Sequence, residues 1–177
     1  MIELEVLSCT RCSLHKQCNQ IVPGNGQPSS PLLILNAGTD KEDDLMGEPL
    51  SGRAGQLFFK LLEQSGIDTK YIYITNMVKC AGPISDFSIK SCKYWVWQEI
   101  QLIKPKVIVT LGEHPTYLLL QNLKASFQMK DVVDKIHQVS YTEAKIMPWY
   151  HPNYLLNRGK AWDKKTIDFF KKVKEII

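Results

Sequence analysis

The sequence lacks long apolar runs, low-complexity tracts and internal repeats. Its longest apolar segments, such as Leu32–Leu35 and Val107–Val109, fall far short of the roughly 20 residues that cross a bilayer. The opening segment, residues 1–5, contains two acids and no basic residue, which is unlike a secretory signal. These absences exclude fibrous, repeat and membrane-spanning classes, and we expect a cytoplasmic protein without a membrane partner.

Neither length nor charge is extreme. The 177 residues are 44% hydrophobic and 23% charged, and the formal net charge is +4. A chain of this size buries roughly 70% of its unfolded surface on folding. We therefore expect a single domain over residues 1–177, acting as a monomer, and the net charge alone says little about its partners.

Four continuous apolar runs of β-type residues alternate with helical patterns along the chain. Continuous runs are typical of strands that are buried on both faces of a parallel sheet. The predicted strands are Leu32–Leu35, Tyr71–Thr75, Lys106–Leu111 and Lys145–Trp149. The predicted helix faces are Leu57, Phe58, Leu61 and Leu62; Cys92, Val96, Ile100 and Ile103; and Ile167, Phe170, Val173 and Ile177. The pattern predicts an α/β fold: a three-layer α/β/α domain with a central, mostly parallel four-stranded sheet.

Distinctive polar segments follow three of these strands, at Asn36–Asp40, Asn76–Cys80 and His151–Leu155. The carboxyl ends of parallel strands meet at one edge of a sheet, and ligands bind outside that edge. We therefore expect the three segments to form one active-site edge.

Five cysteines are present, and the spacing of four of them suits a metal centre. Cys9 and Cys12 form a C-x-x-C pair, Cys80 follows a predicted strand, and we expect Cys92 to start the next helix. Four thiolates from two segments can hold either zinc or an iron–sulfur cluster, and the spacing does not choose between them. Alternatively, Cys80 and Cys92 are buried apolar cysteines, and only the C-x-x-C pair is notable.

Two further strings complete a resemblance to a known family. With the cysteines, Gly52-Arg53-Ala54-Gly55-Gln56-Leu57 and His151-Pro152-Asn153-Tyr154-Leu155-Leu156 resemble the iron–sulfur uracil-DNA glycosylases, often called family four. The resemblance runs from about Cys9 to the carboxyl terminus. It implies the fold of the uracil-DNA glycosylase superfamily and an amino-terminal cluster-binding arm at about residues 1–30. The ligands it implies for a [4Fe-4S] cluster are Cys9, Cys12, Cys80 and Cys92. Cys18 has no counterpart, and we interpret it as a bystander.

The resemblance also implies roles at the predicted edge. Asn76 falls where the family's asparagine reads the uracil edge, a task for which an amide has both a donor and an acceptor. Without the resemblance, Asn76 is better explained as a turn asparagine. His151 falls where a histidine donates to the base carbonyl oxygen on which charge accumulates. The implied wedge residues are Asn153, Tyr154 and Leu155, or its neighbour Leu156. Further implied DNA contacts are Ser51, Gly52, Arg53 and Arg158.

Two positions depart from the family pattern. The family's Gly-Glu-Ala-Pro-Gly aligns with Asn36–Asp40, so that Ala37 stands where the catalytic glutamate would be. Leu50 stands where a phenylalanine stacks on the base. The implied base-binding residues are Asn76, Leu50, Ala37 and Gly38, around a roomier pocket. Asp40 is a candidate to replace the missing carboxylate. Alternatively, Asp40 belongs to an acidic run that lies in a solvated loop, with Glu42, Asp43 and Asp44.

The resemblance implies a DNA base-excision glycosylase that hydrolyses the N-glycosidic bond of uracil or of a related or modified base. We expect water to be the attacking group, because no lysine falls at a position suited to a Schiff base. One alternative is a catalytically impaired relative that binds DNA as a sensor or as a replication or repair accessory. Another is an iron–sulfur redox protein. The lysines crowded into the last 18 residues form either a solvated helix face or a basic stripe against DNA.

Overall fold

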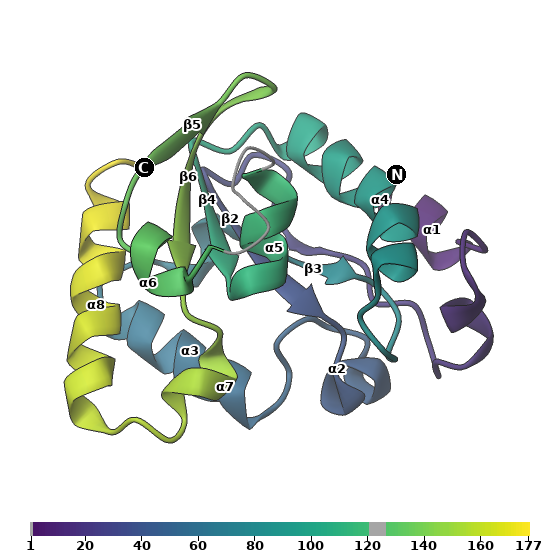
Figure 1. The fold of residues 1–177 in the computed structure, drawn as a ribbon, viewed down its shortest axis with the longest axis horizontal. Helices are drawn as coiled ribbons and strands as arrows, with labels where there is room; N and C mark the ends of the chain where they lie inside the picture. Colours follow the sequence, from purple (N-terminus) through teal and green to yellow (C-terminus); the bar gives the residue numbers. More distant parts are fainter. Residues whose placement is uncertain (1, 121–126) are drawn as a thin grey trace.

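A six-stranded mixed sheet forms the centre of the protein (Figure 1). The structure is a computed structural model that describes residues 2–120 and 127–177. In spatial order the strands are β1 (Asn25–Gly26), β3 (Ile72–Val78), β2 (Leu32–Gly38), β4 (Val107–Leu111), β6 (Thr142–Trp149) and β5 (His137–Val139). The strands β3, β2, β4 and β6 are parallel, whereas β1 and β5 pair antiparallel at the two edges.

The four parallel strands are those that the apolar runs predict, but the predicted strand count of four is too low. The edge strand β1 has only two residues, both exposed, and β5 has no buried residue. Neither edge strand carries an apolar run, because neither is covered on both faces. The strands β2 and β3 also continue past the predicted ends, so that Asn36 and Asn76 lie within them.

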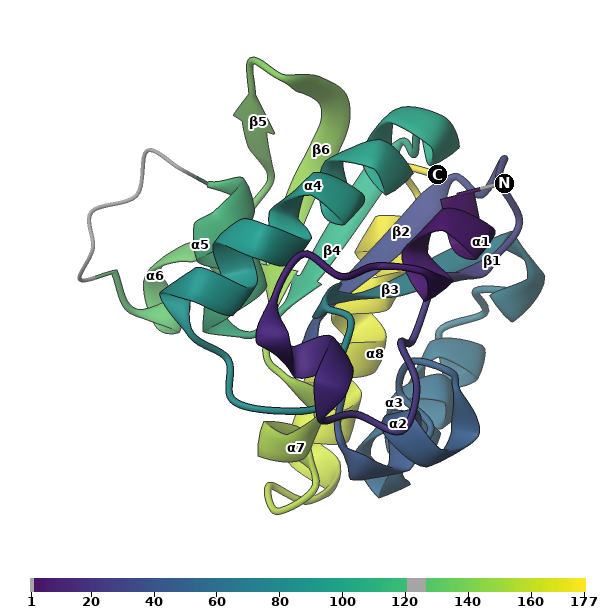
Figure 2. The same cartoon turned by 90° about the vertical axis from the view of Figure 1, so that its right-hand side faces the viewer.

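Helices cover both faces of the sheet, which confirms the three-layer arrangement. Alternate strand residues such as Leu33 and Leu35 pack with α4 (Asp86–Ile103) and α5 (Glu113–Leu119). The intervening residues, such as Leu32 and Ile34, pack with α3 (Arg53–Gln64) and α8 (Lys160–Lys174). Figure 2 shows α4 and α8 on opposite sides of the sheet. This alternation follows from the period of two residues with which strand side chains change faces.

Short helices complete the chain. They are α1 (Ile2–Leu7), η1 (Ser13–Lys16), α2 (Lys41–Met46), η2 (Thr69–Tyr71), α6 (Met129–Val132) and α7 (Pro152–Leu155). Among the helices of the described residues, none combines the length and the apolar character needed to cross a membrane.

Two local predictions about the helices are wrong. The helix α4 begins at Asp86 rather than at Cys92, because Ser85 and Ser88 form a capping box there. The buried face of α8 includes Thr166 and Phe169 in addition to Phe170 and Val173, whereas Ile167 is only partly buried. Ile177 lies beyond the end of the helix and packs, partly buried, against the same core. The aromatic ring of Phe169 stacks on Trp149, with ring centroids 4.2 Å apart, which places Phe169 on the buried face of the helix.

Candidate functional site

The segments predicted to converge lie at the carboxyl ends of the parallel strands. Asn36 of β2 is in register with Asn76 of β3, and their side chains are hydrogen-bonded. His151 follows β6 and caps α7. Gly112 follows β4 with φ +91, and a Cβ added there would lie 3.3 Å from the Cβ of His151. A glycine at this position therefore lets the histidine loop approach the end of β4.

A chain of side-chain hydrogen bonds surrounds Asn76, which is fully buried. Its Oδ1 accepts from Asn36 Nδ2 at 2.8 Å. Its Nδ2 donates to Asp43 Oδ2 at 3.0 Å and to Thr39 Oγ1 at 3.2 Å. Because an amide nitrogen carries two hydrogens, both of its donors are used inside the protein. Asn76 therefore has no donor left over for a ligand in this arrangement.

Asp43 is a site residue that the sequence analysis missed. It is 1% exposed, and its Oδ1 accepts from the backbone N–H of Ser51 at 2.8 Å. Burial raises the pKa of the Asp43 carboxyl, the hydrogen bonds from Asn76 and Ser51 oppose this rise, and the charge of Asp40 adds to it. The bond to Asn76 indicates that Asp43 orients the amide of that residue.

The acidic run is only partly solvated, which corrects the interpretation that it lies in a solvated loop. Glu42 is exposed, but Asp44 is buried, as Asp43 is. Asp44 accepts from the backbone N–H groups of Asn19 and Gln20 at 3.0 to 3.2 Å. These partners come from the amino-terminal arm, so an acidic pattern in the sequence gives no sign of them.

Asp40 is exposed at the mouth of this edge. Its Oδ1 caps α2 by accepting from the backbone N–H of Asp43 at 2.8 Å. Burial lowers the pKa of His151, and the negative charge of Asp40 opposes this lowering. Ala37 and Gly38 are half-buried on β2 just before this loop. The structure thus places the candidate carboxylate on the same edge as the candidate histidine.

His151 is arranged as a neutral hydrogen-bond donor. Its Nδ1 accepts from the backbone N–H of Asn153 at 3.2 Å, which assigns the proton of the neutral ring to Nε2. Burial lowers the pKa of His151, and Asp40 only partly offsets this effect. At neutral pH the ring is therefore uncharged and can donate through Nε2.

The predicted wedge loop forms the short helix α7 and the residues after it. Leu155 is 1% exposed, whereas Leu156 is 39% exposed, so of the two candidate wedge leucines Leu156 is the one that faces solvent. Tyr154 stacks on Tyr150 with centroids 5.0 Å apart, and the guanidinium of Arg158 lies 4.3 Å from the centroid of the Tyr154 ring. An exposed aromatic and basic strip therefore continues outward from His151.

Leu50 lies in the core and borders a cavity of about 210 Å³ that neither Asn76 nor His151 lines. It is 5% exposed, packs in the cluster that contains Phe58, and has φ 59. A Cβ on Gly55 would lie 1.7 Å from the Leu50 carbonyl oxygen, so this crossing requires a glycine. Ser51 is half-buried, Gly52 caps α3, and Arg53 is exposed on the first turn of that helix.

The five cysteines lie close together between the amino-terminal arm, the end of β3 and α4. Burial raises the pKa of the Cys80 thiol, and so do the neighbouring thiols of Cys18, Cys92 and Cys12. Burial also raises the pKa of Cys92, with smaller contributions from Cys12 and Cys9. Cys18 also packs against the core cluster that contains Cys80 and Cys92, a contact that its position in the sequence does not indicate.

The donors around these sulfur atoms suit a soft metal centre. Trp95 Nε1 donates to Cys9 Sγ at 3.1 Å, and the backbone N–H of Lys79 donates to Cys92. Such N–H bonds to sulfur are one means by which proteins tune iron–sulfur clusters. Over residues 2–120 and 127–177, however, no three histidine, cysteine, aspartate or glutamate side chains are placed as ligands of one metal ion. The residue types fit a cluster, and the ligand geometry is not formed.

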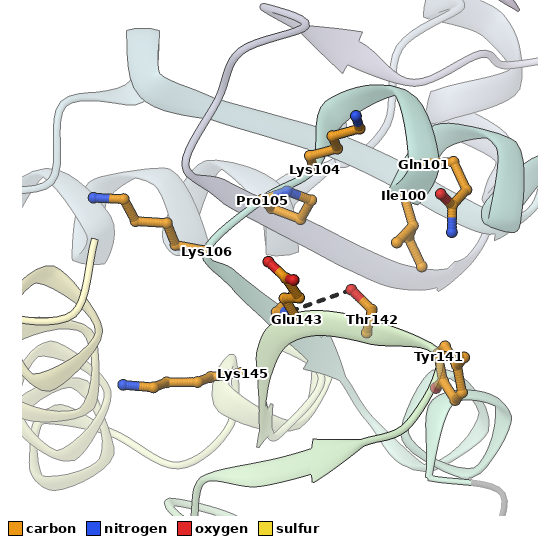
Figure 3. Close-up of a pocket in the computed structure, with 10 residues that line it drawn as sticks. Ile100, Gln101, Lys104, Pro105, Lys106, Tyr141, Thr142, Glu143 and Lys145 are labelled. Atoms are coloured by element: carbon orange, nitrogen blue, oxygen red, sulfur yellow. Dashed lines mark hydrogen bonds between the residues drawn. The ribbon is translucent and has the colours of Figure 1, made fainter.

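A cavity of about 610 Å³ lies away from the candidate site (Figure 3). It is lined by residues at the end of α4 and at the starts of β4 and β6, which is the opposite end of the parallel strands from His151. Figure 3 shows the side chains of Lys106 and Lys145 extending to the same side, roughly parallel and apart, and that of Lys104 pointing in another direction. They do not converge on a common ligand, and we assign this cavity no role.

Comparison with known proteins identifies the class. Residues 23–176 match the model of the uracil DNA glycosylase superfamily, and the chain belongs to this superfamily. The more particular likeness is to type-4 uracil-DNA glycosylases. The one from Sulfurisphaera tokodaii is 31% identical, with 99% of this chain and 83% of that protein covered. The one from Thermotoga maritima is 30% identical, with coverages of 100% and 93%. The one from Archaeoglobus fulgidus is 29% identical, with coverages of 97% and 89%.

Proposed function

We propose that the protein is a DNA glycosylase that uses water to release uracil, or a closely related base, from DNA. The observation that carries this proposal is the neutral Nε2 donor of His151 on the same sheet edge as Asn76 and Asp40. The relatives, which are type-4 uracil-DNA glycosylases, support this substrate class. In the reaction the bond between the base nitrogen and C1′ of the sugar breaks, and its electron pair leaves with the base.

His151 stabilises the departing base. As the bond breaks, negative charge develops on a carbonyl oxygen of the base, and the Nε2–H group donates to that oxygen. A preorganised donor of this kind contributes about 10²–10³ to the rate. Because Nδ1 is held by the backbone N–H of Asn153, the ring does not need to reorient for this task.

Asp40 is the candidate residue for orienting the attacking water. The family glutamate is replaced by Ala37, and Asp40 is the exposed carboxylate that acts electrostatically on His151. We propose that Asp40 orients the attacking water and stabilises the positive charge that develops on the sugar. The water oxygen then bonds to C1′, the proton that the water gives up passes through solvent to the departing base anion, and the products are a neutral free base and an abasic site.

The cysteines would hold a [4Fe-4S] cluster, whose role here is structural. Cys9 and Cys12 belong to the amino-terminal arm, whereas Cys80 lies two residues after β3 and Cys92 lies on α4. A cluster bound to all four would fasten the arm to the sheet, and the arm in turn supplies the N–H partners of Asp44. Iron and acid-labile sulfide content of anaerobically purified protein tests this assignment against zinc.

A binding protein without excision activity is the second candidate. Ala37 removes the family carboxylate, and Asn76 is occupied by protein partners. Both observations are compatible with a chain that retains uracil-containing DNA without cleaving it. Tight binding to uracil DNA with no release of base would favour this candidate.

Single-turnover kinetics on an oligonucleotide with one uracil separate the two candidates. We expect wild-type protein to convert the uracil to an abasic site and the variant His151→Ala to be slower by about 10²–10³. The matched control is His137→Ala, because His137 lies on the edge strand β5 and its ring is hydrogen-bonded to the Val132 carbonyl, away from His151. Equal rates for wild type and His151→Ala would overturn the assignment of His151.

A further inference from the structure

An aromatic cluster of Tyr150, Tyr154 and Trp162 lies directly beside His151. Tyr150 and Tyr154 stack with ring centroids 5.0 Å apart, and Trp162 meets both rings edge to face at 5.1 and 5.3 Å. Figure 1 shows how α7, which carries Tyr154, leads through a short loop into the start of α8, which carries Trp162. Tyr154 is 36% exposed, and the other two side chains are half-buried. Aromatic side chains that gather in a partly exposed patch are typical of an interaction site.

Two cations lie on this cluster instead of pairing with carboxylates. The guanidinium of Arg158 lies 4.3 Å from the centroid of the Tyr154 ring, and Nζ of Lys165 lies 4.7 Å from that of Trp162. Both cations are exposed, and neither forms a salt bridge within residues 2–120 and 127–177. The surrounding segment, residues 158–174, contains seven basic and two acidic side chains. The charge of this surface therefore suits a polyanion.

A cavity of about 350 Å³ opens beside the aromatic cluster. Its lining includes the aromatic side chains of Trp149, Tyr150, Trp162 and Phe169 and the basic side chains of Lys165 and Lys172. The two acids in the lining are already paired: Asp134 lies 2.5 Å from Lys172, and Asp168 lies 3.9 Å from Lys171. Cavities of about 300–1,000 Å³ hold small ligands. This one combines flat aromatic walls with the charge of Lys165, and a nucleotide combines a flat base with a phosphate.

Exposed aromatic rings favour an unpaired strand over a duplex. In a duplex the bases are paired and stacked on one another, so a protein ring beside the helix meets mainly the backbone. In a single strand each base has a free face, and its stacking on an aromatic side chain raises affinity by about 5- to 150-fold. Tyr150 directly precedes His151 in the chain. A base that stacks on the cluster is therefore a close neighbour of the target base.

We propose that the aromatic cluster and the cavity beside it bind an unpaired nucleotide next to the target base, so that the protein prefers single-stranded DNA. The neighbouring base stacks on the aromatic side chains, and Arg158 and Lys165 pair with phosphates of the same strand. This inference rests on the proposed function and adds to it the form of the substrate and a contact surface on α8. The DNA contacts that the family resemblance implies end at Arg158 and do not include Trp162 or Lys165.

The test compares two single-stranded oligonucleotides with the same phosphates. Both carry 2′-fluorodeoxyuridine at the target position, because the fluorine disfavours positive charge on the sugar and so prevents excision. One has ordinary bases around the target, and the other has abasic residues at the two positions on each side. The Kd of each is measured by fluorescence anisotropy. We expect wild-type protein to bind the strand with ordinary bases about 5- to 150-fold more tightly.

Variants assign this ratio to the cluster. In Trp162→Leu, which keeps an apolar side chain, the ratio should fall to about 2 or less. In Arg158→Gln and Lys165→Gln both strands should bind more weakly, and the slope of log K against log salt should shrink by about 0.7 in each. The matched control is Tyr71→Leu, because Tyr71 is 58% exposed and lies before β3, at the opposite end of the parallel strands from His151. Its ratio should equal that of wild type.

Thermal unfolding of every variant shows whether it folds. The wild-type comparison and the two glutamine variants, whose side chains are exposed, stand even if Trp162→Leu does not fold. The strand with ordinary bases is also measured after annealing to its complement, and it should then bind at least about 5-fold more weakly, because its neighbouring bases no longer reach the cluster.

The outcomes separate this inference from the function on which it rests. If wild-type protein binds a strand with thymidine at the target position as tightly as the uracil strand, the proposed function fails. If it prefers uracil but binds the abasic-flanked strand or the duplex equally well, the function stands and this inference is wrong. If Trp162→Leu folds and keeps the full ratio, the bases stack elsewhere, and the assignment to the cluster is overturned.

Discussion

Replacing Lys79 by methionine should destabilise the protein far more than an average substitution. Lys79 Nζ lies 2.8 and 2.7 Å from the two carboxylate oxygens of Glu99, and both side chains are 1% exposed. In Lys79→Met, Glu99 would keep its bonds from Thr75 at 3.0 Å but would lose its compensating charge. Breaking a buried pair on one side costs about 3–5 kcal/mol, because the remaining charge is left uncompensated.

Urea unfolding of anaerobically prepared protein measures this cost. With a slope of about 2 kcal/mol per molar urea, the midpoint should fall by roughly 1.5–2.5 M. The double variant Lys79→Met/Glu99→Leu should recover most of the loss, since no charge then remains buried. The control is Lys172→Met, whose partner Asp134 is 2.5 Å away but whose pair is 54% and 40% exposed. An exposed pair contributes about 0–1 kcal/mol. If Lys79→Met were no more costly than Lys172→Met, the reasoning about this buried pair would be refuted.

Further predictions address the site, the cysteines and the packing at Gly55. Because burial lowers the pKa of His151 below 6.5, the excision rate should stay constant as the pH is lowered to 6.5 and should fall only below that value. The fall occurs because Nδ1, once protonated, can no longer accept the hydrogen bond from Asn153. A pH–rate profile that already declines above pH 6.5 would contradict this prediction. The same lowered pKa makes folding stability fall as pH drops below the unfolded value. Cys9→Ala should lower the iron content of purified protein, whereas Cys18→Ala should leave it unchanged, and iron loss in Cys18→Ala would make Cys18 a ligand. Gly55→Ala places a Cβ 1.7 Å from the Leu50 carbonyl oxygen and should lower the Tm by at least about 4 °C in a thermal scan.

The layers of the fold were predictable because burial on both faces leaves a direct mark on the sequence. Continuous apolar runs such as Leu32–Leu35 identify parallel strands, and their order along the chain gives the alternation with helices. The edge strands β1 and β5 escaped prediction because an uncovered strand needs no apolar run. The start of α4 was also missed, although Ser85 and Ser88 have capping-box spacing and could have indicated it.

The site was less predictable, because its character depends on partners that are distant in sequence. Resemblance located Asn76 and His151, but only the structure shows that Asn36 covers the acceptor of Asn76. Asp43 lies in an acidic run that is exposed at Glu42 and buried one residue later, and its bond to Asn76 spans 33 positions. Nor does any local pattern pair Lys79 with a glutamate on α4.

The most direct test of the account is to identify what the protein releases from DNA. Anaerobically purified protein is incubated with an oligonucleotide that carries one uracil, and free bases and abasic sites are quantified by mass spectrometry. The account predicts one free uracil for each abasic site formed, with release slowed in His151→Ala and unaffected in His137→Ala. Tight binding of the same oligonucleotide without any released base would contradict it and leave a DNA-binding protein in place of a glycosylase.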